Sequence, residues 1–183
     1  MAKIYTIPNI ITFVRIILIP IIIYLLFSDN SKVVLVAGLL FIVSSISDYF
    51  DGYLARKYAI ESELGAFLDL IADKILVTAI LVWLVFIFAN QALTIISILI
   101  ILREIIITSF RYYLVSNNAD PELIKANKYG KLKTAFQFFS ILLLILSPAL
   151  SNFYLNISLV LLSASVLLSY FSLAIYFTNW MKQ

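Results

Sequence analysis

The sequence contains no cysteine and no histidine. Without cysteine no disulfide can form, and neither thiolate nor imidazole is available as a metal ligand. The absence of histidine also excludes Ser-His and Cys-His nucleophile pairs. A metal ion bound by this chain must therefore be held by oxygen atoms, which favours hard cations such as Mg²⁺, Mn²⁺ or Ca²⁺.

Charged residues are also scarce, at 13% of the chain, whereas 63% of the residues are hydrophobic. This composition is far from that of a soluble globular protein. The 183 residues are enough for one domain. We therefore expect residues 1–183 to form a single membrane domain.

Long apolar stretches fill most of the chain, and none of them shows the alternation typical of a strand. A transmembrane helix needs roughly 20 mostly apolar residues. The sequence therefore predicts an all-α integral membrane protein, a bundle of six transmembrane helices at about residues 8–27, 33–56, 65–89, 92–115, 131–146 and 153–178. Asp120-Pro121-Glu122 resembles a helix start and predicts a short interfacial helix in the one long connection.

Basic residues are distributed unevenly between the two sides of this predicted bundle. With both termini in the cytoplasm, every Lys and Arg except Lys32 falls on the inner half. This is the asymmetry described by the positive-inside rule, and it predicts cytoplasmic termini. It also accounts for the net charge of +3, so no nucleic-acid partner is expected.

Four aspartates, Asp48, Asp51, Asp69 and Asp73, lie within the second and third predicted helices. One charge at the bilayer centre costs about 3 kcal/mol on insertion scales. Spacings of three and four place each pair on one helix face. Clustered carboxylates repel one another unless a counter-charge is present, and one or two divalent cations would supply it. The alternative is that the aspartates pair with Lys or Arg to hold the bundle together, although few basic residues lie near them.

The wider pattern D-x2-D-G-x2-A-R-x8-G-x3-D-x3-D covers residues 48–73. It resembles the signature of the CDP-alcohol phosphotransferases, with every spacing matched. The resemblance implies a six-helix membrane enzyme, homodimeric, with its active site open to the cytoplasm. Such an enzyme transfers a phosphatidyl or phosphoalcohol group from a CDP-activated donor to an alcohol and releases CMP.

The resemblance also implies roles for individual residues. The four aspartates would bind two divalent metal ions, Mg²⁺ or Mn²⁺. Asp69 and Asp73 would be the catalytic pair, and whether Asp73 removes the proton of the acceptor or only positions metal is open. The positions lining the CDP site would be Gly52, Ala55, Arg56 and Gly65.

A second set of charged residues lies further along the chain, in R-E-x6-R at residues 103–111 and G-K-x-K-T-x2-Q at residues 130–137. This much positive charge suggests an acceptor that carries its own phosphate. The residues predicted to bind that phosphate are Arg111, Lys131 and Lys133, followed by Arg103 and Lys128. The alternative is that the lysines only set topology, and that Glu104 is the partner of the intramembrane arginines.

Near the start of the chain, Asn9, Thr12 and Arg15 are predicted to shape the donor site, or else Asn9 and Thr12 only cap and connect helices. With the two charged motifs, this stretch resembles the bacterial branch of the family that joins CDP-diacylglycerol to sn-glycerol 3-phosphate at the cell membrane. The alternatives are another acceptor (serine, an inositol phosphate or phosphatidylglycerol), a divalent-cation transporter, or a scaffold protein.

Overall fold

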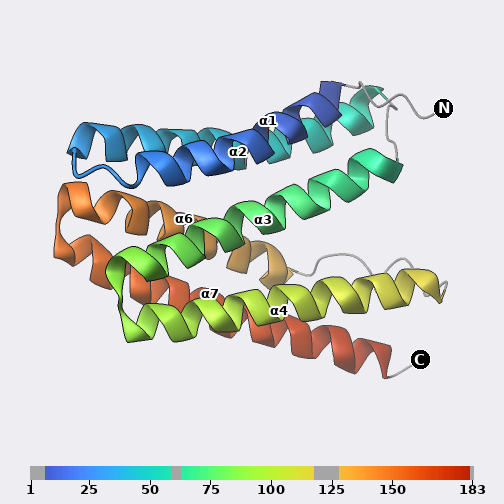
Figure 1. Cartoon of the computed structure of the whole chain (residues 1–183). Helices are drawn as coiled ribbons and strands as arrows, with labels where there is room; N and C mark the ends of the chain where they lie inside the picture. The colour runs from blue at the N-terminus through green and yellow to red at the C-terminus, as the bar shows by residue number, and fades with distance from the viewer. Residues whose placement is uncertain (1–6, 59–62, 118–127, 182–183) are drawn as a thin grey trace. The chain divides into compact units, whose positions relative to one another are not determined.

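The computed structural model is all-helical throughout the residues that it describes, which are 7–58, 63–117 and 128–181. Side chains are described for residues 11–47, 71–117, 128–151 and 153–181. All six predicted helices are present (Figure 1). They are α1 (Ile7–Leu25), α2 (Ser31–Tyr58), α3 (Glu63–Phe88), α4 (Gln91–Ser116), α6 (Lys128–Leu150) and α7 (Asn152–Trp180).

Four segments within the described residues are long and apolar enough to cross a membrane. Two shorter apolar helices, Ile11–Leu25 and Ser31–Ser47, accompany them. The four longer segments are Ile71–Phe88, Gln91–Ser116, Lys128–Leu150 and Phe153–Trp180. Hydropathy therefore identified the helices correctly.

The fifth predicted helix is somewhat longer than expected. We expected it to cover about residues 131–146 and to end near Pro148, and α6 runs from Lys128 through Pro148 to Leu150. Proline lacks an amide donor, but membrane helices tolerate it because neighbouring groups satisfy the carbonyl that loses its partner. The start of the short interfacial helix, predicted at residues 120–122, lies outside the described residues.

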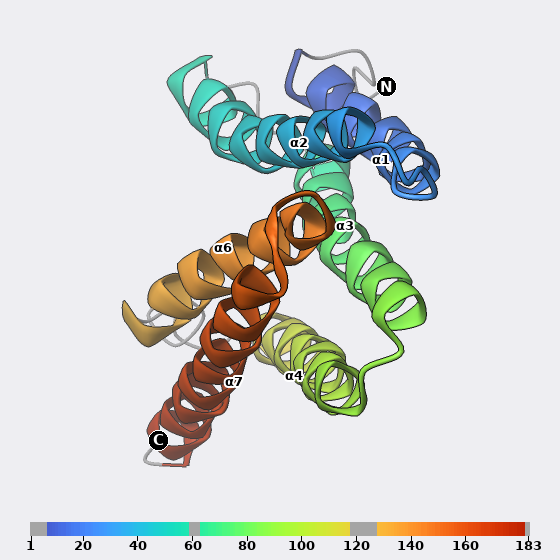
Figure 2. The same ribbon diagram turned by 90° about the vertical axis from the view of Figure 1, so that its left-hand side faces the viewer.

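The chain divides into two compact units. The first comprises Met1–Phe86 and Ile145–Ser151, and in it α1 and α2 pack side by side (Figures 1 and 2). Asn30 starts α2, because its Oδ1 accepts a hydrogen bond from the Lys32 amide at 3.0 Å. Ile22, Ala37 and Phe41 are almost completely buried in this unit.

The second unit comprises Ile87–Leu144 and Asn152–Gln183. It begins at the turn into α4, where Ala89 has a left-handed φ of 43° and Asn90 Oδ1 accepts from the Leu93 amide at 3.0 Å. The helices α4 and α7 lie side by side in both views (Figures 1 and 2). Ile107 and Leu173 form the core of this helix pair.

Candidate functional site

The four aspartates lie on helical backbone, as their spacing predicts. Asp48 and Asp51 are on α2, and Asp69 and Asp73 are on α3. The two helices belong to the first unit, run in opposite directions (Figure 1) and are separated along the chain only by residues 59–62. Asp73 is half-buried, whereas the side chains of the other three lie outside the described residues.

The predicted donor-site residues fall mostly in the same part of the chain. Thr12 and Arg15 lie three residues apart on α1 and are 3% and 1% exposed. The remaining positions have side chains outside the described residues: Asn9, Gly52, Ala55, Arg56 and Gly65.

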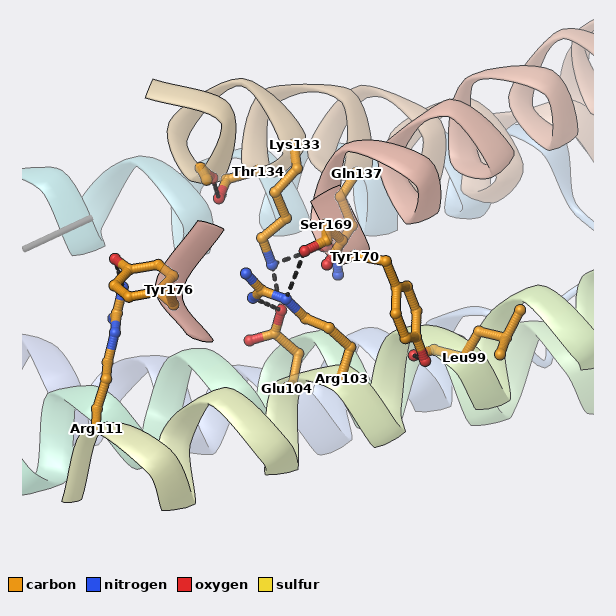
Figure 3. Close-up of polar contacts among 11 residues, drawn as sticks. Leu99, Arg103, Glu104, Arg111, Lys133, Thr134, Gln137, Ser169, Tyr170 and Tyr176 are labelled. Atoms are coloured by element: carbon orange, nitrogen blue, oxygen red, sulfur yellow. Dashed lines mark hydrogen bonds and ion pairs between the residues drawn. The ribbon is translucent and has the colours of Figure 1, made fainter. Parts of the chain in front are cut away.

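Four side chains from α4 and α6 form a buried ion cluster in the second unit (Figure 3). The cluster consists of Arg103, Glu104, Lys133 and Gln137. Glu104 Oε1 accepts hydrogen bonds from Arg103 Nη1 at 3.0 Å and from Lys133 Nζ. Lys133 Nζ also lies 3.4 Å from Gln137 Oε1, and Arg103 Nε donates to the backbone carbonyl of Ser169 on α7 at 3.3 Å. The ion cluster therefore connects three helices.

The charges of this cluster are well removed from solvent. Arg103, Glu104 and Lys133 are 4%, 8% and 7% exposed. Desolvating an ion costs several kcal/mol, so buried charges persist only where opposite charges and hydrogen bonds compensate them. The suggestion that Glu104 is the partner of an intramembrane arginine is confirmed for Arg103. Sequence reasoning did not identify Lys133 as a further partner of Glu104.

Arg111 has a different environment, two turns further along α4. Its Nη2 donates a hydrogen bond to the Tyr176 hydroxyl on α7 at 2.8 Å, and its Cζ lies 5.3 Å from the Tyr176 ring centroid. Within the described part of the chain, its Nε is buried and has no hydrogen-bond partner. Glu104, the partner that the sequence suggested for both arginines, forms ion pairs with Arg103 and Lys133 instead.

Two further predicted residues, Lys128 and Lys131, are exposed at the start of α6. The structure thus brings Arg103 and Lys133 together and gives Arg111, Lys128 and Lys131 other surroundings. Tyr176 was not predicted. A signal was present, because a tyrosine within an apolar helix needs a partner for its hydroxyl.

Comparisons with known proteins give a consistent result. Residues 5–174 match the CDP-alcohol phosphatidyltransferase family. A Rickettsia typhi protein named CDP-diacylglycerol–glycerol-3-phosphate 3-phosphatidyltransferase is 36% identical over 151 residues, which is 82% of each chain. Proteins of the same name from Wigglesworthia glossinidia brevipalpis and Pseudomonas fluorescens are 33% and 34% identical. These alignments cover 93% and 81% of this chain, and 92% and 76% of the relatives. The chain belongs to the CDP-alcohol phosphatidyltransferase family.

Proposed function

We propose that this protein transfers the phosphatidyl group of CDP-diacylglycerol to sn-glycerol 3-phosphate, forming phosphatidylglycerophosphate and CMP. The observation that carries this proposal is the similarity to enzymes of that name over most of both chains. The acceptor hydroxyl oxygen forms a new bond to the phosphatidyl phosphorus, and the bond from that phosphorus to CMP breaks. A base accepts the proton of the acceptor hydroxyl.

The chain crosses a bacterial cell membrane six times in this proposal, with both termini and the active site on the cytoplasmic side. The four apolar spans and the two shorter apolar helices support it. A helix rises about 1.5 Å per residue, so the 28 residues of α2 are long enough to cross the hydrocarbon core. The concentration of Lys and Arg on one side supports the orientation. We also propose that the enzyme is a homodimer, as the family signature implies.

Asp48, Asp51, Asp69 and Asp73 would hold two divalent ions, Mg²⁺ or Mn²⁺. The donor set fits, because carboxylate oxygens suit hard cations and the chain has no Cys or His. The helical backbone at all four positions also keeps each pair on one face. When bound, such ions neutralise the charge of the pyrophosphate and of the departing CMP.

Asp73 is the proposed base that accepts the proton of the acceptor hydroxyl, with Asp69 as its catalytic partner. A carboxylate is the only type of base that the four-aspartate motif offers. The donor nucleotide would lie against the small residues of the motif and beside Arg56, with Arg15 and the side chains of Asn9 and Thr12 shaping the site from α1. The small residues of the motif are Gly52, Ala55 and Gly65, and such residues allow a ligand to approach the helix backbone closely.

The phosphate of glycerol 3-phosphate would be bound by cations of α4 and α6. Arg111 is the leading candidate, because no carboxylate among the described residues lies within ion-pair distance of it. Lys131 and Lys128 are exposed and accessible to an anion from water. Lys133 and Arg103 remain in the proposal as members of the ion cluster, where two cations share one carboxylate.

CMP release from purified protein tests this function. CDP-diacylglycerol would be supplied with Mg²⁺ or Mn²⁺ and with glycerol 3-phosphate, serine, inositol 1-phosphate or phosphatidylglycerol as acceptor. We expect release with glycerol 3-phosphate alone, its reversible loss on chelation of the metal, and almost no release by folded Asp69→Ala protein. Release with another acceptor only would contradict the assigned substrate, and full activity of folded Asp69→Ala protein would contradict the mechanism.

A further inference from the structure

We infer that Tyr176 is a positioning residue that holds the Arg111 guanidinium ready to bind the phosphate of the acceptor. This inference rests on the proposed function, because it concerns how the acceptor phosphate is held. It assigns a task to α7, a helix for which the sequence motifs suggested none.

The ring of Tyr176 is well fixed. It is 6% exposed and forms a core with Ile107 of α4 and Leu173 of α7. Phe110, Tyr170 and Phe177 pack around that core. Because a buried aromatic ring in a close-packed core keeps one orientation, its hydroxyl is a fixed acceptor for Arg111.

The hydrogen bond to Tyr176 uses only one of the N–H donors of Arg111. An arginine has five N–H donors, and Tyr176 accepts one of the two on Nη2. The Arg111 Nε is buried and has no hydrogen-bond partner within the described residues. An unsatisfied buried donor is costly, and a phosphate oxygen would satisfy it.

Tyr176 orients Arg111 without neutralising it, as a carboxylate in its place would do. A phenol hydroxyl is neutral, so it orients the guanidinium and leaves its positive charge available. Arg103 illustrates the other case, because its Nη1 contacts the Glu104 carboxylate at 3.0 Å (Figure 3). Long side chains such as arginine lose rotamer freedom on binding, so fixing Arg111 beforehand strengthens phosphate binding.

The test compares Tyr176→Phe with Tyr170→Phe. Both substitutions remove one hydroxyl from α7 and keep the ring, but Tyr170 donates to the Leu99 carbonyl at 3.2 Å and does not contact the Arg111 guanidinium. We expect Tyr176→Phe to raise the KM for glycerol 3-phosphate about three- to tenfold, with kcat and the KM for CDP-diacylglycerol unchanged. Tyr170→Phe should change none of the three.

A double-variant cycle sharpens the test. In an Arg111→Ala background, Tyr176→Phe should cause no further increase in KM, because the residue that it positions is gone. If Tyr176→Phe protein does not fold, Tyr176→Met replaces it, since it also lacks the hydroxyl.

Three outcomes would overturn the inference: an unchanged KM in folded Tyr176→Phe protein, an equal rise in Tyr170→Phe, or additive effects in the cycle. The proposed function fails separately, if wild-type protein does not release CMP with glycerol 3-phosphate.

Discussion

Arg103 and Arg111 lie on the same helix, eight residues apart, yet their surroundings differ in kind (Figure 3). Arg103 is buried and contacts the Glu104 carboxylate and a backbone carbonyl of α7. Arg111 is half-buried, contacts one phenol hydroxyl and keeps an unsatisfied Nε within the described residues. A cation in an apolar helix can thus either form ion pairs that connect helices, as Arg103 does, or contact only neutral groups and so be able to bind an anion, as we propose for Arg111.

Because their surroundings differ, we expect substitutions at the two sites to change different quantities, namely the free energy of unfolding and the KM for the acceptor. Removing a member of the ion cluster should lower the free energy of unfolding, because the charges that remain are buried. Removing Arg111 should weaken acceptor binding and leave stability nearly intact, because the residues in contact with it carry no opposite charge. The four variants below test this separation.

The largest effect is expected for Glu104→Ala, which leaves two buried cations without their shared carboxylate. Breaking a buried ion pair costs about 3–5 kcal/mol. Unfolding of detergent-solubilised protein would measure the loss. Ser97→Ala is the matched control on α4, because the buried Ser97 hydroxyl has no hydrogen-bond partner in the described part of the chain. Equal stability of the two variants would show that the ion cluster does not hold the helices together.

Arg111→Ala should raise the KM for glycerol 3-phosphate about tenfold to a hundredfold, the loss expected when a charged hydrogen-bond donor is removed. Its unfolding free energy should stay close to the wild-type value. Tyr112→Ala removes the next side chain, which is 76% exposed, and should leave the KM unchanged. An unchanged KM in Arg111→Ala would remove Arg111 from the acceptor site.

Lys133→Met should have intermediate effects on both quantities. Glu104 keeps Arg103 at 3.0 Å, so the loss of stability should be about 1–3 kcal/mol and smaller than for Glu104→Ala. The KM for glycerol 3-phosphate should rise, but less than in Arg111→Ala, because Glu104 already shares the ammonium. Unfolding and steady-state kinetics are compared with Thr134→Ala at the exposed neighbouring position. A larger rise in KM than for Arg111→Ala would show that Lys133, and not Arg111, contributes more to binding of the acceptor.

The smallest effect is expected for Lys131→Ala. Lys131 is exposed, so its attraction for a phosphate is weakened by water and salt. The KM should rise about two- to fivefold at low ionic strength, and the difference should disappear at high salt. Lys32→Ala is the control, because Lys32 is exposed and is assigned to the outer side of the membrane. A similar rise for Lys32→Ala would contradict the proposed orientation.

Local patterns in the sequence were sufficient to predict most of the fold. Runs of apolar residues predicted all six helices, and the four aspartates of the motif lie on helical backbone, as their spacing predicted. The end of α6 lies two residues beyond Pro148, the position near which we expected it, because this helix tolerates the proline.

The side-chain contacts between helices could not be predicted from local patterns in the sequence. Lys133 and Glu104 are 29 residues apart, and Arg111 and Tyr176 are 65 apart. Such pairs depend on how each helix is rotated about its axis, which apolar residues on all sides of a membrane helix do not reveal.

Identification of the lipid product tests the central claim most directly. Purified protein would be incubated with CDP-diacylglycerol, glycerol 3-phosphate and divalent metal, and the lipid extract analysed by mass spectrometry while CMP is quantified. The proposed function predicts phosphatidylglycerophosphate formed in equal amount to CMP. CMP release without a lipid that contains the acceptor phosphate would contradict it.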